Sequence, residues 1–290
     1  MDWKPGDISE DIEDRRDEGG GGGGGYSGMR LGMPHMGIGG FLVLLVLSFV
    51  FQRNLFTIFS DGSEPERPVA SRPANTGAES NEVKFVSFVL DDIQKTWQGE
   101  LQSQGGRPYR HAKLVLFRDF IESACGQAES ATGPFYCPGD EKVYLDLGFF
   151  DELRGHLGAP GEFAQAYVIA HEIGHHVQKI LGIESKVQRL RQSNPSASNA
   201  LSVRLELQAD CLAGVWAKST QQRKIIDQSD IEAGLRGVAS VGDDRLQKMA
   251  TGHVSPERFT HGTSRQRMEW FQHGLESGQL ASCDTFAPSR

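Results

Sequence analysis

The sequence predicts an α+β fold that is mostly helical, contains a small β-sheet and is preceded by a single transmembrane helix. Three observations predict it. A nearly unbroken apolar run covers residues 37–59, several later segments carry apolar residues at helical spacing, and two short segments have the composition of strands. We therefore divide the chain into a flexible glycine-rich tail at 1–36, a transmembrane anchor at 37–59, a linker at 60–81 and one folded domain at 82–290.

The tail and the linker are identified by composition. Residues 1–36 are poor in large apolar side chains and contain an unbroken glycine run from Gly19 to Gly25. Such a segment buries too little surface to offset the entropy lost on ordering, so we expect it to be flexible. Residues 60–81 are rich in serine, proline, glutamate and asparagine, which is typical of a linker.

The apolar run at 37–59 has three interpretations. A cleaved signal peptide requires a shorter basic leader and a small-residue cleavage site, and neither is evident. A buried core helix requires a core to join, yet both flanks have the composition of disordered segments. We favour a membrane anchor in which Gln52, Arg53 and Asn54 reach toward an interface. Flanking charge does not orient this anchor, because Arg30 and Arg53 lie close to its two sides.

Helices dominate the predicted domain. Periodicity and composition predict helices at Val83–Gln102, Glu162–Leu181 and Ala200–Lys218, and strands at Lys113–Phe117 and Lys142–Leu145. We expect Gly182 to end the second helix, and Ser198 or Asn199 to cap the third. Two further pairs fit the capping-box spacing that opens a helix, Ser229 with Glu232 and Thr263 with Gln266.

Composition and charge exclude some classes of function. Hydrophobic residues make up 38% of the chain and charged residues 23%, as in globular proteins. The formal net charge is −8 at pH 7, which argues against a nucleic-acid partner, because phosphate binding requires a cationic surface.

The cysteines bear on the compartment. The chain contains Cys125, Cys137, Cys211 and Cys283, and none belongs to a C-x-x-C pair that would suggest a zinc ribbon. All four follow the apolar run, and an even count beside a membrane segment favours disulfides in an oxidising compartment. We predict the pairs Cys125–Cys137 and Cys211–Cys283, while four buried free thiols remain the alternative. The domain is therefore expected outside the cytoplasm.

The motif with the clearest chemistry is His171-Glu172-Ile173-Gly174-His175, an H-E-x-x-H sequence. On a helix, residues four apart share a face about 5–6 Å apart, so both imidazoles can reach one metal ion. Zinc accepts such nitrogen ligands, and the intervening Glu172 is placed to take a proton from a water molecule. The alternative is a helix with incidental histidines. The apolar sequence before the motif argues against it, since buried polar groups require partners.

A third metal ligand is needed, and Glu206 is the best candidate. The longer pattern that ends in a third histidine is excluded, because Gln178 and Leu181 occupy its glycine and histidine positions. Glu206 lies on a separate predicted helix with Asp210 four residues later on the same face. That spacing suits a ligand followed by a carboxylate that orients a ligating histidine. The alternative, two solvated helix charges, is disfavoured by their apolar neighbours.

The other histidines carry no comparable pattern. His176 follows the motif directly and points about 100° away around the helix, so we interpret it as structural. The remaining ones without a partner at useful spacing are His35, His111, His156, His253 and His273.

Several segments together resemble one protein family. Tyr167–Gln178, Leu205–Trp216 and Phe259–Phe271 look like the bacterial "putative neutral zinc metallopeptidase" family, and the similarity extends to Gly133–Pro138 and Ile12–Arg16. The resemblance implies a zincin-like catalytic domain with a gluzincin-like site and one Zn²⁺ per chain. Because that family is bacterial, the anchor at 37–59 is expected to lie in the inner membrane.

Two further site residues come from the same resemblance. CAAX-processing and HtpX-like peptidases have a Thr-His pair, with an arginine six residues after the histidine, near the active site. By position this implies that His261 stabilises an oxyanion and that Arg267 orients it or the ligands. The alternative is that both residues only cap and brace the last helix.

These features predict a membrane-anchored zinc metalloendopeptidase that acts on a peptide or protein substrate. An extended substrate is expected to add to the strand at Lys142–Leu145. The alternative is a membrane-tethered binding or scaffold protein that holds zinc for stability, although structural zinc sites are normally closed by four protein ligands. The sequence does not determine the substrate or the oligomeric state.

Overall fold

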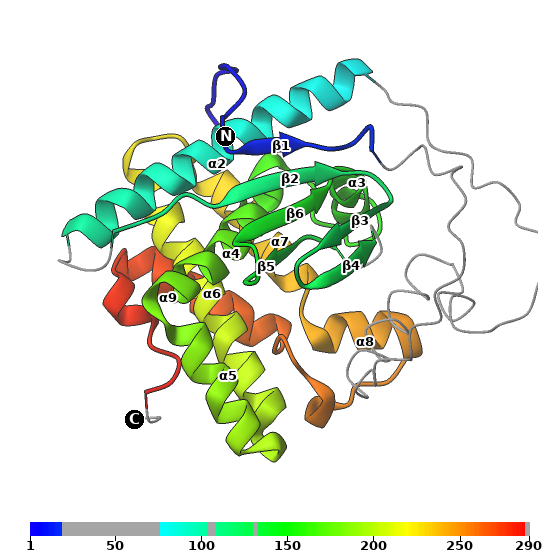
Figure 1. Cartoon of the computed structure of the whole chain (residues 1–290), viewed down its shortest axis with the longest axis vertical. Helices are drawn as coiled ribbons and strands as arrows, with labels where there is room; N and C mark the ends of the chain where they lie inside the picture. The colour runs from blue at the N-terminus through cyan, green and yellow to red at the C-terminus, as the bar shows by residue number, and fades with distance from the viewer. Residues whose placement is uncertain (19–75, 104–107, 130–132, 288–290) are drawn as a thin grey trace, which may run out of the picture.

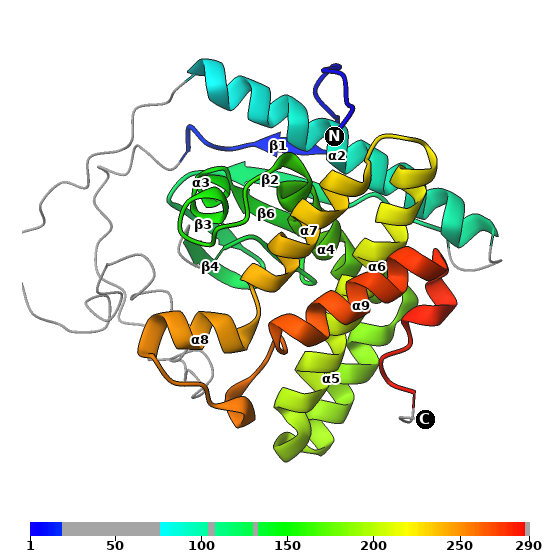
Figure 2. The same cartoon turned by 180° about the vertical axis from the view of Figure 1, so that it is seen from behind.

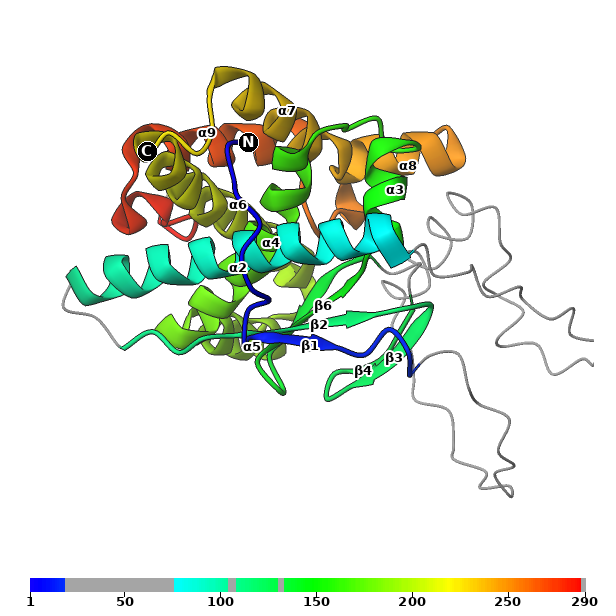
Figure 3. The ribbon, with the colours of Figure 1, turned by 90° about the horizontal axis from the view of Figure 1, so that it is seen from above.

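The computed structural model describes residues 1–18, 76–103, 108–129 and 133–287. Two layers form the fold, a small mixed sheet on one side and a group of helices on the other (Figure 3). The mostly helical α+β prediction is therefore confirmed. The predicted anchor at 37–59 lies outside the described residues, and within those residues no helix combines the length and apolarity needed to cross a membrane.

The main sheet has the strand order β1-β2-β6-β5. Its members are β1 (Ile12–Asp14), β2 (Lys113–Phe117), β6 (Lys142–Asp146) and β5 (Phe135–Cys137). The first three run parallel, and β5 pairs antiparallel with β6. A separate hairpin joins β3 (Phe120–Ser123) to β4 (Gly126–Glu129). Both predicted strands are confirmed, with β6 one residue longer at its end.

The N-terminal residues correct one prediction, because residues 1–18 are not a flexible tail. Strand β1 pairs with β2 at the edge of the main sheet. Ahead of it, the Trp3 ring contacts Phe85 and Phe88 at centroid distances of 5.4 and 5.9 Å. Composition failed here because the segment is held by backbone pairing, charged contacts and one aromatic side chain instead of an apolar stripe.

Eight α-helices are described. They are α2 (Thr76–Ser103), α3 (Gly148–Arg154), α4 (Glu162–Leu181), α5 (Ile183–Ser193), α6 (Ser198–Gln222), α7 (Gln228–Ser240), α8 (Asp243–Thr251) and α9 (Ser264–Ser277). The three predicted helices correspond to α2, α4 and α6, and α2 begins inside the predicted linker. Figure 2 shows α9 lying across α6, with α7 beside α9, on the side away from the sheet.

The helix ends are only partly as predicted. Gly182 ends α4 with φ 77°, and Thr263 and Gln266 form the capping box of α9. The box of α7 instead joins Asp227 and Asp230, two residues before the predicted pair. No side chain caps α6, which a short 3₁₀ turn precedes directly. Two residue pairs with capping-box spacing lie two residues apart in this sequence, and only the surrounding packing determines which of them begins the helix.

Close packing of α6 against α9 fixes the helices that carry the candidate site. A Cβ atom on Gly214 would lie 2.1 Å from the Phe271 carbonyl oxygen, and one on Gly274 would lie 1.9 Å from that of Cys211. Only glycine permits this approach. The disulfide Cys211–Cys283 joins α6 to the turn after α9, and Cys125–Cys137 joins the hairpin region to β5. Both predicted pairings are confirmed.

Candidate active site

Helix α4 carries the H-E-x-x-H motif through the centre of the domain. Its first half, from Phe163 to Ala170, is buried and apolar except for Gln165, which places the motif beneath neighbouring helices. His171 is 6% exposed and Glu172 is 8% exposed. The rings of His171 and His175 lie on one face with centroids 4.9 Å apart, as the i, i+4 spacing predicts.

Glu206 on α6 faces both histidines. His171 Nε2 lies 3.1 Å from Glu206 Oε2, and His175 Nε2 lies 3.5 Å from Glu206 Oε1. One ligand atom from each residue falls within 4.8 Å of the other two. The helices approach closely because Gly174 leaves room, since a Cβ there would lie 3.1 Å from the Ala209 carbonyl oxygen. The described residues thus contain a candidate His, His, Glu zinc site.

Each imidazole is held by the nitrogen that faces away from this group. His171 Nδ1 lies 2.8 Å from Asp210 Oδ1, and His175 Nδ1 lies 2.9 Å from Gln178 Oε1. Gln178 is itself fixed, because its amide donates to the Leu205 carbonyl oxygen at 2.7 Å. Both Nε2 atoms therefore point at the same region beside Glu206. This donor set matches the nitrogen and carboxylate ligands of zinc, with partners that set the orientation of the rings.

Asp210 is the centre of a buried network. It accepts from the Arg267 guanidinium at 2.8 and 2.9 Å and from the Tyr167 hydroxyl at 2.5 Å. Arg267 also donates to the Tyr167 oxygen at 3.0 Å. Sequence reasoning missed Tyr167 and Gln178 as site residues. Tyr167 precedes His171 by four residues, so helical spacing alone would have placed it on the same face.

The site is electrostatically polarised. Burial works to raise the pKa of Asp210, but Arg267 and His171 outweigh it and lower that pKa. Burial likewise works to lower the pKa of His171, but Asp210 and Glu206 outweigh it and raise the value to about 10. The two carboxylates therefore favour a cation between the imidazoles, and a metal ion must displace protons to bind there.

Glu172 differs from the other carboxylates at the site. Burial raises its pKa above the usual value, and the nearby histidines only partly oppose that effect. A general base is most effective when its pKa moves toward the working pH. Its environment thus suits proton transfer, whereas the pKa of Glu206 is held well below its usual range by the histidines despite burial.

His261 lies in the loop before α9 and is held by Asp243. The Asp243 Oδ2 atom accepts the backbone N–H groups of Thr260, His261 and Gly262 at 2.7 to 3.1 Å. Its Oδ1 atom lies 3.1 Å from His261 Nδ1, and the His261 side chain is 43% exposed. Desolvation works to lower the pKa of His261, but Asp243 and Glu206 outweigh it and raise that pKa. No sequence pattern pointed to Asp243.

His176 links α4 to the sheet instead of the metal group. Its Nδ1 atom lies 2.9 Å from the Tyr136 hydroxyl on β5, and its Nε2 atom lies 2.7 Å from the Arg110 carbonyl oxygen. The structural interpretation of His176 is confirmed. The remaining histidines in the described part of the chain contact residues outside the site: His111, His156, His253 and His273.

The prediction that an extended substrate adds to the strand at Lys142–Leu145 is wrong. Strand β6 pairs with β2 on one side and with β5 on the other, so it has no free edge. Among the described pairings, β5 pairs only with β6, and Tyr136 ties it to α4 beside the motif. Strand β5 is therefore an edge strand of the described sheet.

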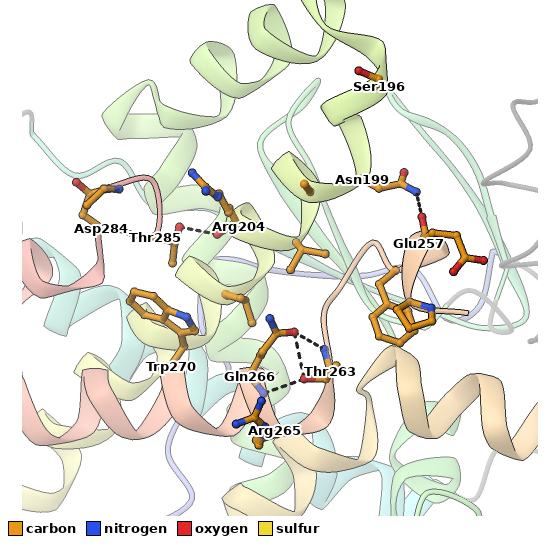
Figure 4. A pocket seen from close by; sticks show the side chains of 16 residues that line it. Ser196, Asn199, Arg204, Glu257, Thr263, Arg265, Gln266, Trp270, Asp284 and Thr285 are labelled. Atoms are coloured by element: carbon orange, nitrogen blue, oxygen red, sulfur yellow. Dashed lines mark hydrogen bonds between the residues drawn. The ribbon is translucent and has the colours of Figure 1, made fainter. Parts of the chain in front are cut away.

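A cavity of about 930 Å³ is lined by residues of α6, α9, the loop before α9 and the C-terminal segment. Figure 4 shows Asn199 of α6 joined to Glu257 by a hydrogen bond, with Arg204, Thr263 and Trp270 among the other lining residues. None of the three candidate ligands lines this cavity. It is therefore distinct from the candidate site.

Comparison with known proteins places the chain in a family. The "Uncharacterized protein YpfJ" of Escherichia coli (strain K12) is 44% identical over 293 residues, covering 100% of both chains. The "Uncharacterized protein Rv2575" of Mycobacterium tuberculosis is 38% identical over 225 residues, covering 73% of this chain and 74% of the relative. No solved structure matches. The family model described as "Putative neutral zinc metallopeptidase" matches residues 1–286, and the chain belongs to that family.

Proposed function

We propose that this protein is a zinc-dependent peptidase that hydrolyses internal peptide bonds, with Glu172 as the general base. The observation that carries the proposal is the convergence of His171, His175 and Glu206, with both imidazoles oriented by fixed partners. Membership of the family supports it. One Zn²⁺ per chain is the expected cofactor.

When bound, zinc would lower the pKa of water and polarise the scissile carbonyl group. Glu172 accepts the proton of the attacking water and can then deliver it to the leaving amine. Asp210 holds His171 in the tautomer that leaves Nε2 free, and Arg267 with Tyr167 holds Asp210 in turn. His261, oriented by Asp243, is the expected donor to the oxyanion that develops on the carbonyl oxygen.

The substrate is proposed to be a peptide or protein in extended conformation. Such a chain can add to the free edge of β5 by backbone hydrogen bonds, which require no particular side chains. The link between Tyr136 and His176 keeps this edge in register with the motif on α4.

The rival function is a binding or scaffold protein that holds zinc for stability. Structural zinc sites are normally closed by four protein ligands, whereas catalytic sites leave a position for water. Across the described residues, only His171, His175 and Glu206 group closely enough to hold a metal ion. This count favours catalysis over a structural role.

We further propose that the domain lies outside the cytoplasm of the bacterial cell and is attached to the inner membrane through residues 37–59. Both disulfides support the compartment, because such bonds persist in oxidising surroundings and are rare in the cytosol. The apolar composition of residues 37–59 supports the attachment.

The test compares three full-length proteins: wild type, Glu172→Gln and Glu232→Gln. Glu232 is exposed on α7 and serves as the matched control. Each is incubated with peptides derived from a whole proteome, and cleavage products and zinc content are measured. We expect Glu172→Gln to keep zinc and to fold, but to cleave at least about 10²–10⁴-fold more slowly than wild type. Glu232→Gln should cleave at the wild-type rate. Near wild-type cleavage by Glu172→Gln would exclude it as the base.

A further inference from the structure

The N-terminal segment, residues 1–18, is built into the folded domain by contacts along its length. The Met1 amino group lies 2.9 Å from Asp230, and the Trp3 indole donates to Glu162 on α4 at 3.1 Å. Backbone N–H of Ser9 donates to the Ser87 hydroxyl at 2.6 Å. These contacts reach α7, α4 and α2 as well as the sheet.

Strand β1 adds ion pairs to its backbone pairing with β2. Lys113 Nζ lies 2.8 Å from Asp11 Oδ1, and Lys142 Nζ lies 2.7 Å from Glu13 Oε2. The two lysines belong to β2 and β6, so both ion pairs tie the N-terminal segment to the central strands.

The two flanks of the apolar run meet in space. Arg16 precedes residues 37–59 and Glu79 follows them, yet Arg16 Nη1 lies 3.0 Å from Glu79 Oε2. Arg118, at the end of β2, donates to the same Glu79 oxygen at 2.7 Å. The two described segments that flank residues 19–75 therefore lie beside each other, as the end of β1 and the start of α2 in Figure 3 also show.

This meeting is incompatible with a single membrane crossing. One crossing would separate Arg16 from Glu79 by the hydrocarbon thickness of about 30 Å. Two crossings would need two apolar helices of about 20 residues each, and the run at 37–59 is long enough for one only. Arg16 and Glu79 are also not expected to pair inside the bilayer, because moving charged side chains into hydrocarbon costs much free energy.

We infer that residues 1–18 and the domain from residue 76 onward lie on the same side of the membrane. This arrangement differs from the predicted single-pass anchor, which would place the two segments on opposite sides of the membrane. This inference is independent of the proposed peptidase activity, because none of its contacts involves the candidate metal ligands.

Zero-length cross-linking of the full chain in native membranes tests it. A membrane-permeable carbodiimide joins a carboxylate to a neighbouring amine as an amide, and mass spectrometry identifies the linked peptides. We expect links between Glu13 and Lys142 and between Asp11 and Lys113. The pair Lys179 and Glu184, whose side-chain atoms lie 3.9 Å apart within the domain, is the internal control, and reagent is increased until it is linked.

The matched variant is Lys142→Arg, which keeps the charge but has no amine for the reagent. It should lose the Glu13 link entirely and retain the Asp11–Lys113 link. Glu172→Gln should give the same links as wild type, which separates this result from the fate of the proposed activity. The same links formed between two copies of the chain would also place residues 1–18 and the domain on one side of the membrane. The inference is overturned when Lys179 and Glu184 are linked and neither N-terminal pair is.

Discussion

The metal-site helices and the N-terminal part of the sheet hold their charges in opposite ways. On α6 and α9, Asp210 is 0% exposed and its partner Arg267 is 4% exposed. On β1 and β6, Glu13 and Lys142 are 34% and 29% exposed. Figure 2 places the first pair of helices within the helical group, and Figure 1 shows the two strands in the open sheet.

The difference indicates which charges the fold depends on. A buried charge that loses its partner cannot recruit water, so the whole desolvation cost remains. A half-exposed charge that loses its partner returns to solvent at little cost. The stability of the site therefore depends strongly on Asp210, Arg267 and Tyr167, whereas the N-terminal segment is held by many weak contacts.

The largest expected effect on stability comes from a substitution at Arg267. Arg267→Met should destabilise the metal-free protein by about 3–5 kcal/mol, because it leaves the Asp210 carboxylate buried without its cation. Lys142→Met is the matched change in the sheet and should cost only about 0–1 kcal/mol. Urea unfolding followed by far-UV circular dichroism measures both. Equal costs for the two variants would remove the contrast between the regions.

The disulfides extend the comparison to the chain's cross-links. Cys211–Cys283 closes 72 residues beside the site, and Cys125–Cys137 closes 12 residues near the sheet. In the loop-entropy model their loss costs about 4 and about 3 kcal/mol respectively. The double variant Cys211→Ala with Cys283→Ala should therefore have the lower urea midpoint than Cys125→Ala with Cys137→Ala. The reverse order would show that strain or residual structure outweighs loop length.

The two regions also differ in how far the sequence predicted them. Helix α4 was predicted to its last residue, because its periodicity is strong and Gly182 ends it. The ligands His171, His175 and Glu206 could be predicted because metal chemistry imposes fixed spacing along helices. In the sheet, β1 was missed, because a three-residue strand with two charges carries no periodic signal.

What the sequence could not supply was contact between distant segments. Asp243 orients His261 from eighteen residues away, and no local pattern joins them. Strand order was equally out of reach, so β6 was mistaken for a strand with a free edge. The roles of Glu172 and His261 in catalysis stay predictions.

The residues around the metal group should differ in their effects on zinc. Asp210→Asn should weaken zinc binding about 10–100-fold, because His171 loses the carboxylate that fixes its ring. His261→Ala should leave zinc affinity unchanged and slow cleavage about 10²–10³-fold, as expected for loss of an oxyanion donor. Competition with a fluorescent chelator gives the affinities. Zinc loss in His261→Ala would instead make that residue part of the ligand shell.

The smallest expected effect is an acid-dependent release of the N-terminal segment. Partial burial works to raise the pKa of Asp11, but Lys113 and His111 outweigh it and lower that pKa below 3.8. A carboxyl group whose pKa is lowered by folding stabilises the folded state above its unfolded pKa. That stabilisation is lost as the pH falls through the lower, folded value. Wild type should therefore keep the segment bound at pH 5 and release it only below about pH 4.

Asp11→Asn lacks this charge at every pH and should already show faster pepsin cleavage ahead of β1 at pH 5. The rate of cleavage within α4 is the reference, since Asp11 makes no contact there. Equal cleavage of wild type and Asp11→Asn at pH 5 would show that backbone pairing and Trp3 alone hold the segment.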